Sequence, residues 1–513
     1  MLKFVVSEDN NWLSLIHFDE EFEKKQIEIS LTKKINNHFF HPLVKKKIWD
    51  GSICFIDKRS HIWRIPLGLW SEVYKIGEKY KIEVKIEGLG GLIDQGFTLE
   101  EYTKWCNEFF KDGVGGDTSK MPRDYQIETA WKIIKFKLSV SEVATSSGKT
   151  LIAFMVMSYL KEVMKVKKFL MVVPNTNLVM QGSEDFEEYG IEKLGDCEIQ
   201  QIHGSNKKKI SGGLMIGTYQ SLVKMDPEFF DDVEAVFVDE CHQSSSASIK
   251  KVIALCKDSK WRFGLSGTLA NKDSAEYITI QQFLGPLIME ISPKFLFENK
   301  YATPVSIKIV KMNWIDPEIK EKLSKLKETK TEIEGNEIFN IERKLVVNSE
   351  KRLEYVINFI LKTSKNSLVL FQSVGEGYGK RIYDGIKERT KDREVYYIDG
   401  DTEPSKREIF LNRMEDGINK ILVASFGTLS TGISIKNIHN IFLTESYKSE
   451  VLIKQSLGRG MRLFEGKEKV NVIDFVDDFS FEGKDNYLMK HSKERIEIYK
   501  REQFDYKIYE MKI

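Results

Sequence analysis

Short apolar runs recur along most of the chain, and each is followed by a segment long enough for a helix. The runs occupy residues 168–173, 213–216, 235–238 and 262–265, and then 367–371, 395–398, 421–424, 441–443 and 470–473. Continuous apolar runs of this length are typical of strands buried on both faces, and their alternation with helices predicts parallel sheets covered by helices. Two groups of runs predict two α/β lobes.

The remaining segments have other patterns. Residues 314–352 are strongly charged with a helical period, which predicts a solvated helix pair at the start of the second lobe. The N-terminal residues alternate in short β-like pieces up to the glycine-rich segment 111–117, which predicts an accessory domain and a linker. The predicted domains are an α+β accessory domain at 1–112, a first lobe at 113–295, a second lobe at 296–480 and a C-terminal helical extension at 481–513.

Composition restricts the class of protein without naming a function. The chain has 513 residues and a net charge of +1, so it is no polycation, and any contact with nucleic acid must come from local patches. Its five cysteines form no C-x-x-C pair, which argues against a zinc site or a disulfide framework. Residues 151–160 form one of the most apolar stretches, about half of what spans a bilayer. We expect a cytoplasmic protein without a membrane segment.

A candidate phosphate-binding loop occupies residues 146–150. It follows a strand-like segment and precedes an apolar helix, where unpaired backbone amides and the helix dipole favour an anion. Gly148 allows close approach of phosphates, Lys149 neutralises their oxygens, and the Thr150 hydroxyl suits Mg²⁺. Val143 replaces the glycine usual at the start of such a loop. The alternative is an ordinary strand-to-helix turn.

Two adjacent carboxylates, Asp239 and Glu240, follow the apolar run 235–238. Ligands of parallel sheets bind beyond the carboxyl ends of the strands. Asp239 is predicted to hold Mg²⁺ and Glu240 to polarise an attacking water. The alternative, an acidic pair that caps a helix, is weakened by the phosphate-loop candidate upstream.

Three long polar side chains, Gln455, Arg459 and Arg462, follow one another at i, i+4 and i+7. This spacing predicts that they share one face of a helix in the second lobe. Arginine suits phosphate recognition because its planar guanidinium stays charged. The alternative is a solvated basic helix face.

The residues Asp-Glu-Cys-His at 239–242 and Ser-Gly-Thr at 266–268 resemble motifs II and III of the superfamily 2 helicases of the DExH type. The segment 455–462 is similar to motif VI, whose arginines act on the γ-phosphate. The resemblance implies two RecA-like lobes that bind ATP and Mg²⁺. It also implies that His242, Ser266 and Thr268 couple the nucleotide state to the grip on nucleic acid.

Other segments resemble the remaining motifs of the family in order, from Arg123 to Arg462. Arg123 and Gln126 match the adenine-reading motif. The resemblance assigns ATP contacts to Arg123, Gln126, Ser146, Ser147, Gly148, Lys149, Thr150, Gly432, Arg459 and Arg462. It assigns nucleic-acid contacts to Pro174, Asn175, Thr218, Ser221, Gln372, Ser373 and Thr428. Ser434 replaces an aspartate often found in motif V.

Within the superfamily, the chain resembles the UvsW-type recombination helicases of bacteriophages. Trp-Asp-Gly at 49–51 and Pro-Leu-Gly at 66–68 extend this resemblance into the accessory domain. It implies action on branched or duplex DNA or on R-loops with their RNA–DNA hybrid. It also implies a monomer in the host cytoplasm, with recombination or single-strand-binding proteins as possible partners.

The accessory domain has a local concentration of cations and aromatic residues between residues 45 and 64. Cations neutralise phosphates and aromatic rings stack on bases. The predicted nucleic-acid contacts there are Lys45, Lys46, Lys47, Trp49 and Arg59. The alternative is that the tryptophans belong to the core, since residues 1–112 carry 17 basic and 18 acidic side chains.

These features together predict an ATP-driven DNA helicase or translocase. The alternatives are a double-strand translocase or annealing motor without net unwinding, and an RNA helicase, because the core motifs grip mainly the backbone. A small-molecule kinase with a phosphate loop is disfavoured, since it leaves the second lobe and its arginine segment unexplained.

Overall fold

The computed structural model describes most of the chain and divides it into two compact units. The described residues are 1–8, 11–36, 38–93, 96–204, 213–242, 246–269, 271–316, 319–321, 323, 335–429, 435–446 and 450–513. The first unit contains Met1–Val143 and Gly148–Glu290, and the second contains Ala144–Ser147 and Ile291–Ile513.

A seven-stranded sheet forms the centre of the described part of the first unit, in the order β13-β7-β12-β11-β8-β10-β9. Its strands are β7 (Leu138–Val143), β8 (Lys168–Val173), β9 (Ile199–Ile202), β10 (Gly213–Thr218), β11 (Ala235–Asp239), β12 (Trp261–Ser266) and β13 (Leu287–Ile291). The registers from β7 to β9 are all parallel. The predicted parallel lobe is therefore confirmed.

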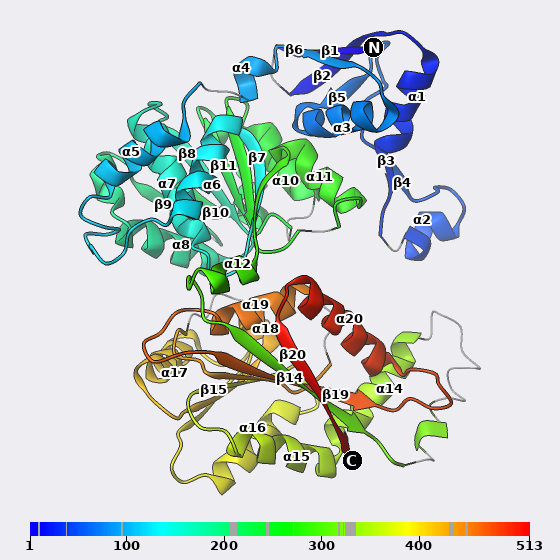
Figure 1. Ribbon diagram of the computed structural model, residues 1–513, viewed down its shortest axis with the longest axis vertical. Helices are drawn as coiled ribbons and strands as arrows, with labels where there is room; N and C mark the ends of the chain where they lie inside the picture. Colours follow the sequence, from blue (N-terminus) through cyan, green and yellow to red (C-terminus); the bar gives the residue numbers. More distant parts are fainter. Residues whose placement is uncertain are drawn as a thin grey trace. The chain divides into compact units, whose positions relative to one another are not determined.

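Helices cover this sheet in two groups (Figure 1). One group is α6 (Asp124–Phe136), α7 (Lys149–Glu162) and α8 (Thr176–Glu188); the other is α9 (Tyr219–Leu222), α10 (Ser246–Leu255) and α11 (Ala275–Leu284). The strands are almost wholly buried, as their apolar sequences predict.

The second unit contains another seven-stranded parallel sheet among its described residues, in the order β16-β17-β15-β18-β19-β14-β20. Its strands are β14 (Val305–Asn313), β15 (Ser367–Phe371), β16 (Val395–Ile398), β17 (Ile421–Ser425), β18 (Asn440–Leu443), β19 (Val470–Asp478) and β20 (Asp505–Lys512). Its helices are α12 (Pro293–Glu298), α14 (Gly335–Asn348), α15 (Glu350–Leu361), α16 (Tyr378–Arg389), α17 (Pro404–Asp416), α18 (Phe426–Leu429), α19 (Glu450–Gly460) and α20 (Tyr487–Arg501). Together the two sheets confirm the fold of two RecA-like lobes.

The prediction of a purely helical C-terminal extension is wrong in its last part. Helix α20 fits the prediction, but β20 then pairs in parallel with β14 at the edge of the second sheet. Most residues of β20 are exposed, so the strand lacks the apolar run that marks the other strands. Part of the predicted helix pair at 314–352 lies outside the described residues; α14 and the start of α15 are helical as predicted.

The N-terminal region has the expected mixed α+β architecture. A four-stranded sheet contains β1 (Leu2–Val6), β2 (Trp12–Phe18), β5 (Arg64–Pro66) and β6 (Val84–Glu87), with α1 (Glu21–Ser30) and α3 (Trp70–Tyr80). An arm at residues 32–54 contains β3 (Thr32–Lys34), α2 (Pro42–Lys45) and β4 (Ser52–Cys54), and it lies apart from that sheet (Figure 1). Helices α4 (Gly90–Ile93) and α5 (Leu99–Phe109) follow.

The N-terminal region packs on the sheet of its own unit through α11. A Cβ atom at Gly68 would lie 2.2 Å from the Gln281 carbonyl oxygen, so only glycine allows this close approach. Asn36 Nδ2 donates to Glu276 Oε2 at 3.0 Å, and Tyr277 belongs to the core shared by both regions. The arm is thereby fixed to the first lobe.

Candidate nucleotide-binding site

Three of the predicted motifs meet at the carboxyl edge of the first sheet. Strands β7, β12 and β11 are neighbours in the sheet, and the phosphate loop, Ser266 and Asp239 stand at their carboxyl ends. In parallel sheets these ends form the ligand-binding edge. Segments separated by more than 90 positions in the sequence therefore reach one place.

The phosphate loop has an unusual backbone. Ser146 and Gly148 both have positive φ angles, of 68° and 82°. Gly148 is the N-cap of α7, so Lys149 and Thr150 lie in the first turn of the helix, where backbone amides favour an anion. The φ angle of Gly148 favours glycine, and a Cβ atom there would lie 2.5 Å from Gln126 Nε2 and would displace that amide.

Lys149 forms a buried ion pair with Glu240. Burial disfavours the charged form of Lys149, but Glu240 and Asp239 outweigh that effect and raise its pKa. Burial opposes the charge of Glu240 too, and Lys149, with a smaller contribution from His242, outweighs it, so the pKa of Glu240 is lowered. Both groups are therefore ionised at neutral pH.

Asp239 is the carboxylate of this cluster that ionises least readily. Burial raises its pKa to about 6 against the attraction of Lys149, and the charge of Glu240 adds to the rise. Its Oδ1 accepts the backbone N–H of Glu240 at 2.9 Å, and Glu240 has a φ angle of 45°, which is strained for a residue with a side chain. Two carboxylates thus share one lysine, and a divalent cation would relieve this excess negative charge.

The donor set fits Mg²⁺ held together with a nucleotide. The structure shows no cluster of three or more metal-ligating His, Cys, Asp or Glu side chains within the described ranges. Mg²⁺ usually takes only one or two protein ligands and completes its shell with waters and phosphates. Asp239 and Thr150 are compatible with that arrangement.

A chain of polar contacts runs from Glu240 to Thr268. His242 Nδ1 lies 3.3 Å from Glu240 Oε2 and 2.6 Å from Ser266 Oγ. Because the Ser266 hydroxyl donates to the Thr268 carbonyl at 2.5 Å, the ring nitrogen donates to Ser266. The three residues that the resemblance assigns to coupling are therefore in contact.

The adenine-reading candidates lie at the start of α6. Arg123 is the N-cap, and its backbone N–H donates to Gln126 Oε1 at 2.9 Å. Gln126 is buried, with its amide nitrogen close to Gly148. The structure thus joins this motif to the phosphate loop.

The nucleic-acid candidates of the first lobe stand at the ends of β8 and β10, which are paired strands. Asn175 accepts the backbone N–H of Leu178 and caps α8, and Thr218 accepts that of Ser221 and caps α9. Pro174 and Thr218 are buried, whereas Asn175 and Ser221 are partly exposed. Their contact with nucleic acid stays a prediction.

The arginine segment of the second unit differs from the prediction in one respect. Helix α19 ends at Gly460, so Arg462 lies two residues beyond it and does not share the helical face of Arg459. The helix ends where Gly460 packs closely on Val470 and Ile441, a contact that the sequence does not reveal. Burial, followed by repulsion from Arg462, lowers the pKa of Arg459 to about 10.

Several predicted residues of the second unit are only partly covered by the structure. Gly432 lies outside the described residues, and the side chain of Gln455 is not described. Thr428 is buried, and its hydroxyl lies 2.7 Å from that of Ser425.

Glu445 is a buried residue that the sequence reading missed. It accepts the backbone N–H groups of Gln372 at 2.6 Å and of Ser373 at 3.0 Å, and the Ser373 hydroxyl as well. The signal for it is a polar Thr-Glu-Ser triplet directly after the apolar run 441–443. Glu445 fixes two of the predicted nucleic-acid contacts, Gln372 and Ser373.

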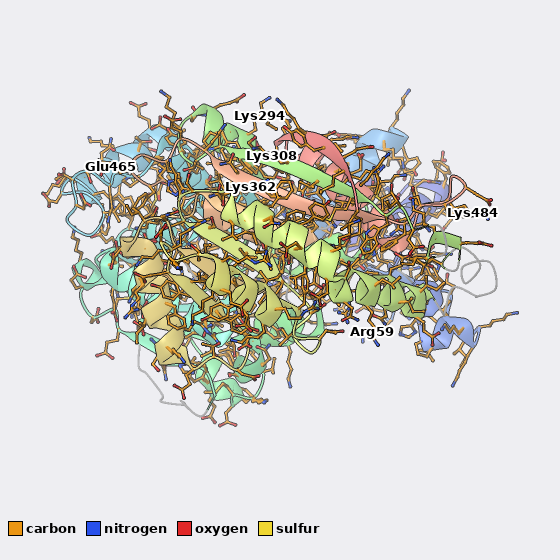
Figure 2. All side chains as sticks on the ribbon, turned by 90° about the horizontal axis from the view of Figure 1, so that it is seen from below. Arg59, Lys294, Lys308, Lys362, Glu465 and Lys484 are labelled. Carbon is orange, nitrogen blue, oxygen red and sulfur yellow. The ribbon has the colours of Figure 1, made fainter. Side chains whose placement is uncertain are left out.

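The predicted nucleic-acid contacts of the accessory domain divide into two kinds. Lys45, Lys46 and Lys47 are exposed on the arm, whereas the Trp49 indole is half-buried and donates to the Ser52 carbonyl at 2.8 Å. Arg59, which is labelled in Figure 2, is 86% exposed, but its guanidinium binds Asp57 through two bonds of 2.9 Å. The lysines are the most available cations of this group.

Two family models match the chain, one in each unit. Residues 119–271 match "Type III restriction enzyme, res subunit", and residues 351–464 match "Helicase conserved C-terminal domain". Among the described residues, no helix is long and apolar enough to cross a membrane.

Individual proteins extend the similarity. The ATP-dependent DNA helicase uvsW of Enterobacteria phage T4 is 27% identical over 484 residues, which cover 91% of each chain. A type I restriction enzyme EcoAI endonuclease subunit of Escherichia coli is 22% identical over 74% of this chain and 49% of its own. A fragment of a putative HsdR subunit of a type I restriction enzyme from Vibrio vulnificus YJ016 shares the fold, with a TM-score of 0.55 at 17% identity over 76% of this chain and 69% of that chain. The chain is therefore an ATP-dependent helicase, and it is similar to the UvsW helicase over nearly its whole length.

Proposed function

We propose that this helicase acts on DNA, specifically on branched DNA or R-loops during recombination, repair or replication. The similarity to a DNA helicase over 91% of both chains supports this substrate class, because it includes the accessory region as well as the motor. The observation that carries the motor function is the continuous set of contacts from Lys149 through Glu240 and His242 to Ser266.

In this proposal the first unit holds Mg-ATP at the carboxyl edge of its sheet. Lys149 and the backbone amides of the first turn of α7 neutralise phosphate oxygens, and Thr150 and Asp239 hold Mg²⁺. Gln126 recognises adenine beside Gly148. Bound Mg-ATP supplies the phosphoryl group that is transferred to water.

Glu240 is proposed to orient the attacking water and accept its proton. In the structure its charge is balanced by Lys149. When Lys149 pairs with phosphates, Glu240 loses this partner and its carboxylate becomes available as a base. Arg459 and Arg462 of the second lobe are proposed to stabilise the charge that develops on the transferred group.

The His242–Ser266–Thr268 contacts are proposed to carry the state of Glu240 to the nucleic-acid strand. His242 touches both Glu240 and Ser266, so a change in the charge around Glu240 alters the hydrogen bonds of the segment after β12. Asn175, Ser221, Gln372 and other candidates would hold the backbone of the strand.

The arm is proposed as a nucleic-acid contact of the accessory region. It exposes three consecutive lysines beside large apolar side chains, among them Phe39, Phe40 and Ile48, which are 49%, 48% and 69% exposed. Cations beside exposed aromatic rings suit phosphates and unstacked bases. The Trp49 bond to Ser52 and the His41–Trp49 ring contact at 5.1 Å hold this surface in shape.

A substrate panel tests the proposal. ATP hydrolysis and strand separation would be measured with single-stranded, duplex, forked, four-way and R-loop DNA, and with matched RNA. We expect stimulation by DNA and the highest unwinding rates on forked, four-way or R-loop substrates. Equal rates on all substrates would refute a branch-specific role, and stimulation by RNA alone would replace DNA with RNA as the substrate.

A further inference from the structure

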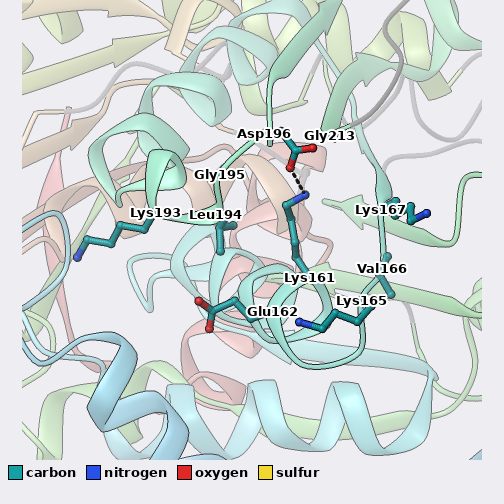
Figure 3. Close-up of a pocket in the computed structure, with 10 residues that line it drawn as sticks. All are labelled: Lys161, Glu162, Lys165, Val166, Lys167, Lys193, Leu194, Gly195, Asp196 and Gly213. Carbon is teal, nitrogen blue, oxygen red and sulfur yellow. Dashed lines mark hydrogen bonds and ion pairs between the residues drawn. The ribbon is translucent and has the colours of Figure 1, made fainter.

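A basic pocket lies at the amino ends of strands of the first sheet, whereas the nucleotide site lies at their carboxyl ends. Figure 3 shows the residues that line this pocket. The pocket has a volume of about 530 Å³ and lies between the end of α7, the short helix η3 (Ile191–Leu194) and Gly213 at the start of β10. Its segments lead into β8, β9 and β10, so the pocket lies at the amino ends of strands whose carboxyl ends carry the motor motifs.

Four lysines and two carboxylates line this pocket, which gives it a net charge of +2. Both carboxylates are already engaged: Asp196 pairs with Lys161 at 3.3 Å, and Glu162 accepts the indole N–H of Trp105 at 3.0 Å. The other three lysines are exposed, and within the described ranges none of them forms an ion pair; they are Lys165, Lys167 and Lys193. In Figure 3 the dashed line joins Lys161 and Asp196.

The backbone holds these lysines in fixed positions. Lys165 has a φ angle of 60°, and the next residue, Val166, donates to the Leu160 carbonyl at 3.0 Å. The Lys167 N–H donates to Glu234 at 3.0 Å, and its carbonyl accepts from Gly213 at 3.2 Å. The backbone at Lys165 and Lys167 is therefore held in place before any ligand binds.

The rest of the lining offers nothing that reads a sequence or a base. Val166 and Leu194 are buried, and no aromatic or amide side chain is among the described lining residues. Lysines act on phosphates as point charges, without the directional fork of arginine. A ligand of this pocket is thus recognised by a regular array of negative charge, which favours a phosphate backbone over a peptide whose side chains must be recognised.

We propose that this pocket binds the sugar–phosphate backbone of a duplex DNA arm, at a place separate from the strand gripped by the motor motifs. The inference rests on the proposed function, because a branched substrate supplies a second duplex arm that can reach this pocket while one strand is held at the motor motifs. It gives a physical basis for a preference for branched over linear DNA.

Charge reversal of the three lysines tests the site. The variant Lys165→Glu/Lys167→Glu/Lys193→Glu is compared with a control in which three exposed lysines of the same unit are reversed, Lys250→Glu/Lys251→Glu/Lys257→Glu. Fluorescence anisotropy would measure the Kd for a four-way junction and for a single strand at several salt concentrations. We expect the Kd for the junction to rise about tenfold or more. The slope of log Kd against log salt concentration should become shallower, by an amount that corresponds to up to about three phosphate contacts. Single-strand binding should stay within about twofold of the wild type.

Several results would overturn the inference. Equal junction affinity in the variant and the control would exclude this pocket as a DNA contact, and an equal loss for the single strand would exclude a separate arm. Binding of a poly-glutamate peptide that depends on the three lysines, without any effect on DNA, would assign the pocket to an acidic protein instead. If the triple variant unfolds, Lys165→Gln/Lys193→Gln replaces it, with a loss of about threefold or more expected. Failure of the proposed function is distinct, because the wild type would then show no DNA-stimulated ATP hydrolysis.

Discussion

The second unit buries Arg352 against Asp477, whereas the first unit buries Lys149 beside Asp239 and Glu240. Arg352 donates to both oxygens of Asp477 at 2.7 and 2.8 Å, and also to the Thr444 carbonyl at 2.8 Å. The two charges are equal, fully buried and satisfied by one another. Burial disfavours the charge of Arg352, but Asp477 outweighs it and raises the arginine pKa.

The buried charges of Lys149, Asp239 and Glu240 in the first unit do not balance one another in this way. Two carboxylates share one lysine, the pKa of Asp239 rises to about 6, and Glu240 has a positive φ angle. Buried charge that is fully paired stabilises a particular packing, whereas incompletely balanced charge on strained backbone is characteristic of functional sites. The difference separates a structural use of buried charge from a catalytic one.

Replacement of the proposed base should give the largest effect. Glu240→Gln keeps the shape of the side chain but removes its charge, so we expect ATP hydrolysis to fall by about 10²- to 10⁴-fold with ATP binding retained. Steady-state hydrolysis and nucleotide-binding titrations would be measured, with the exposed Glu228→Gln as the control. Hydrolysis within threefold of the wild type would remove Glu240 from the mechanism.

Disruption of the Arg352–Asp477 pair should lower the stability of the fold and not the chemistry of ATP hydrolysis. Arg352→Met leaves Asp477 buried without its cation, and we expect a loss of about 3–5 kcal/mol in the free energy of unfolding. Chemical denaturation would be compared with Arg389→Met, which breaks an exposed pair with Glu354 and should cost less than about 1 kcal/mol. Similar losses in both variants would contradict the structural role of the buried pair.

Loss of the contact between His242 and Ser266 should impair strand separation more than ATP hydrolysis. We expect His242→Ala to lower the number of base pairs separated per ATP by about fivefold or more, a typical size for coupling between sites, with a smaller effect on hydrolysis itself. Ser266→Ala should act in the same direction, because it removes the other end of the contact. A proportional loss of both activities would show that these residues serve the chemistry alone.

Lys467 in the second unit should make a smaller, pH-dependent contribution to the free energy of unfolding. Burial and, less strongly, Arg462 lower its pKa to about 8, while Glu415 opposes the shift. Because the unfolded chain binds this proton more tightly, the contribution of Lys467 to stability rises as the pH increases from about 8 towards the ordinary lysine pKa of 10.5. Lys467→Met should remove a rise of about 2 kcal/mol in the free energy of unfolding between pH 7.5 and pH 9.5, measured by chemical denaturation at both pH values. An unchanged pH dependence would contradict the shift.

The sequence predicts those parts of the fold that depend on local burial. Strands such as β8 and β11 are continuous apolar runs because helices cover both faces of the sheet. Lys149, Asp239 and Glu240 follow such strands, so the edge where they meet follows from the topology. The exposed edge strand β20 lacks this signal and was not predicted.

The features that the sequence does not show depend on contacts between distant segments. Helix α19 ends at Gly460, which lies close to Val470 and Ile441, so Arg462 lies outside the helix. Glu445 holds Gln372 and Ser373 across about 70 positions of sequence. The lysines at 165, 167 and 193 have no motif in the sequence and come together only in the folded lobe.

The most direct test of whether Lys149, Asp239 and Glu240 form the motor site is DNA-stimulated ATP hydrolysis by the variant Lys149→Ala. The account predicts a fall of about 10²-fold or more in a variant that still folds, with a lower unfolding midpoint because the buried Asp239 and Glu240 lose their cation, and with Lys257→Ala active as the control. Stimulated hydrolysis by folded Lys149→Ala at the rate of the wild type would contradict it.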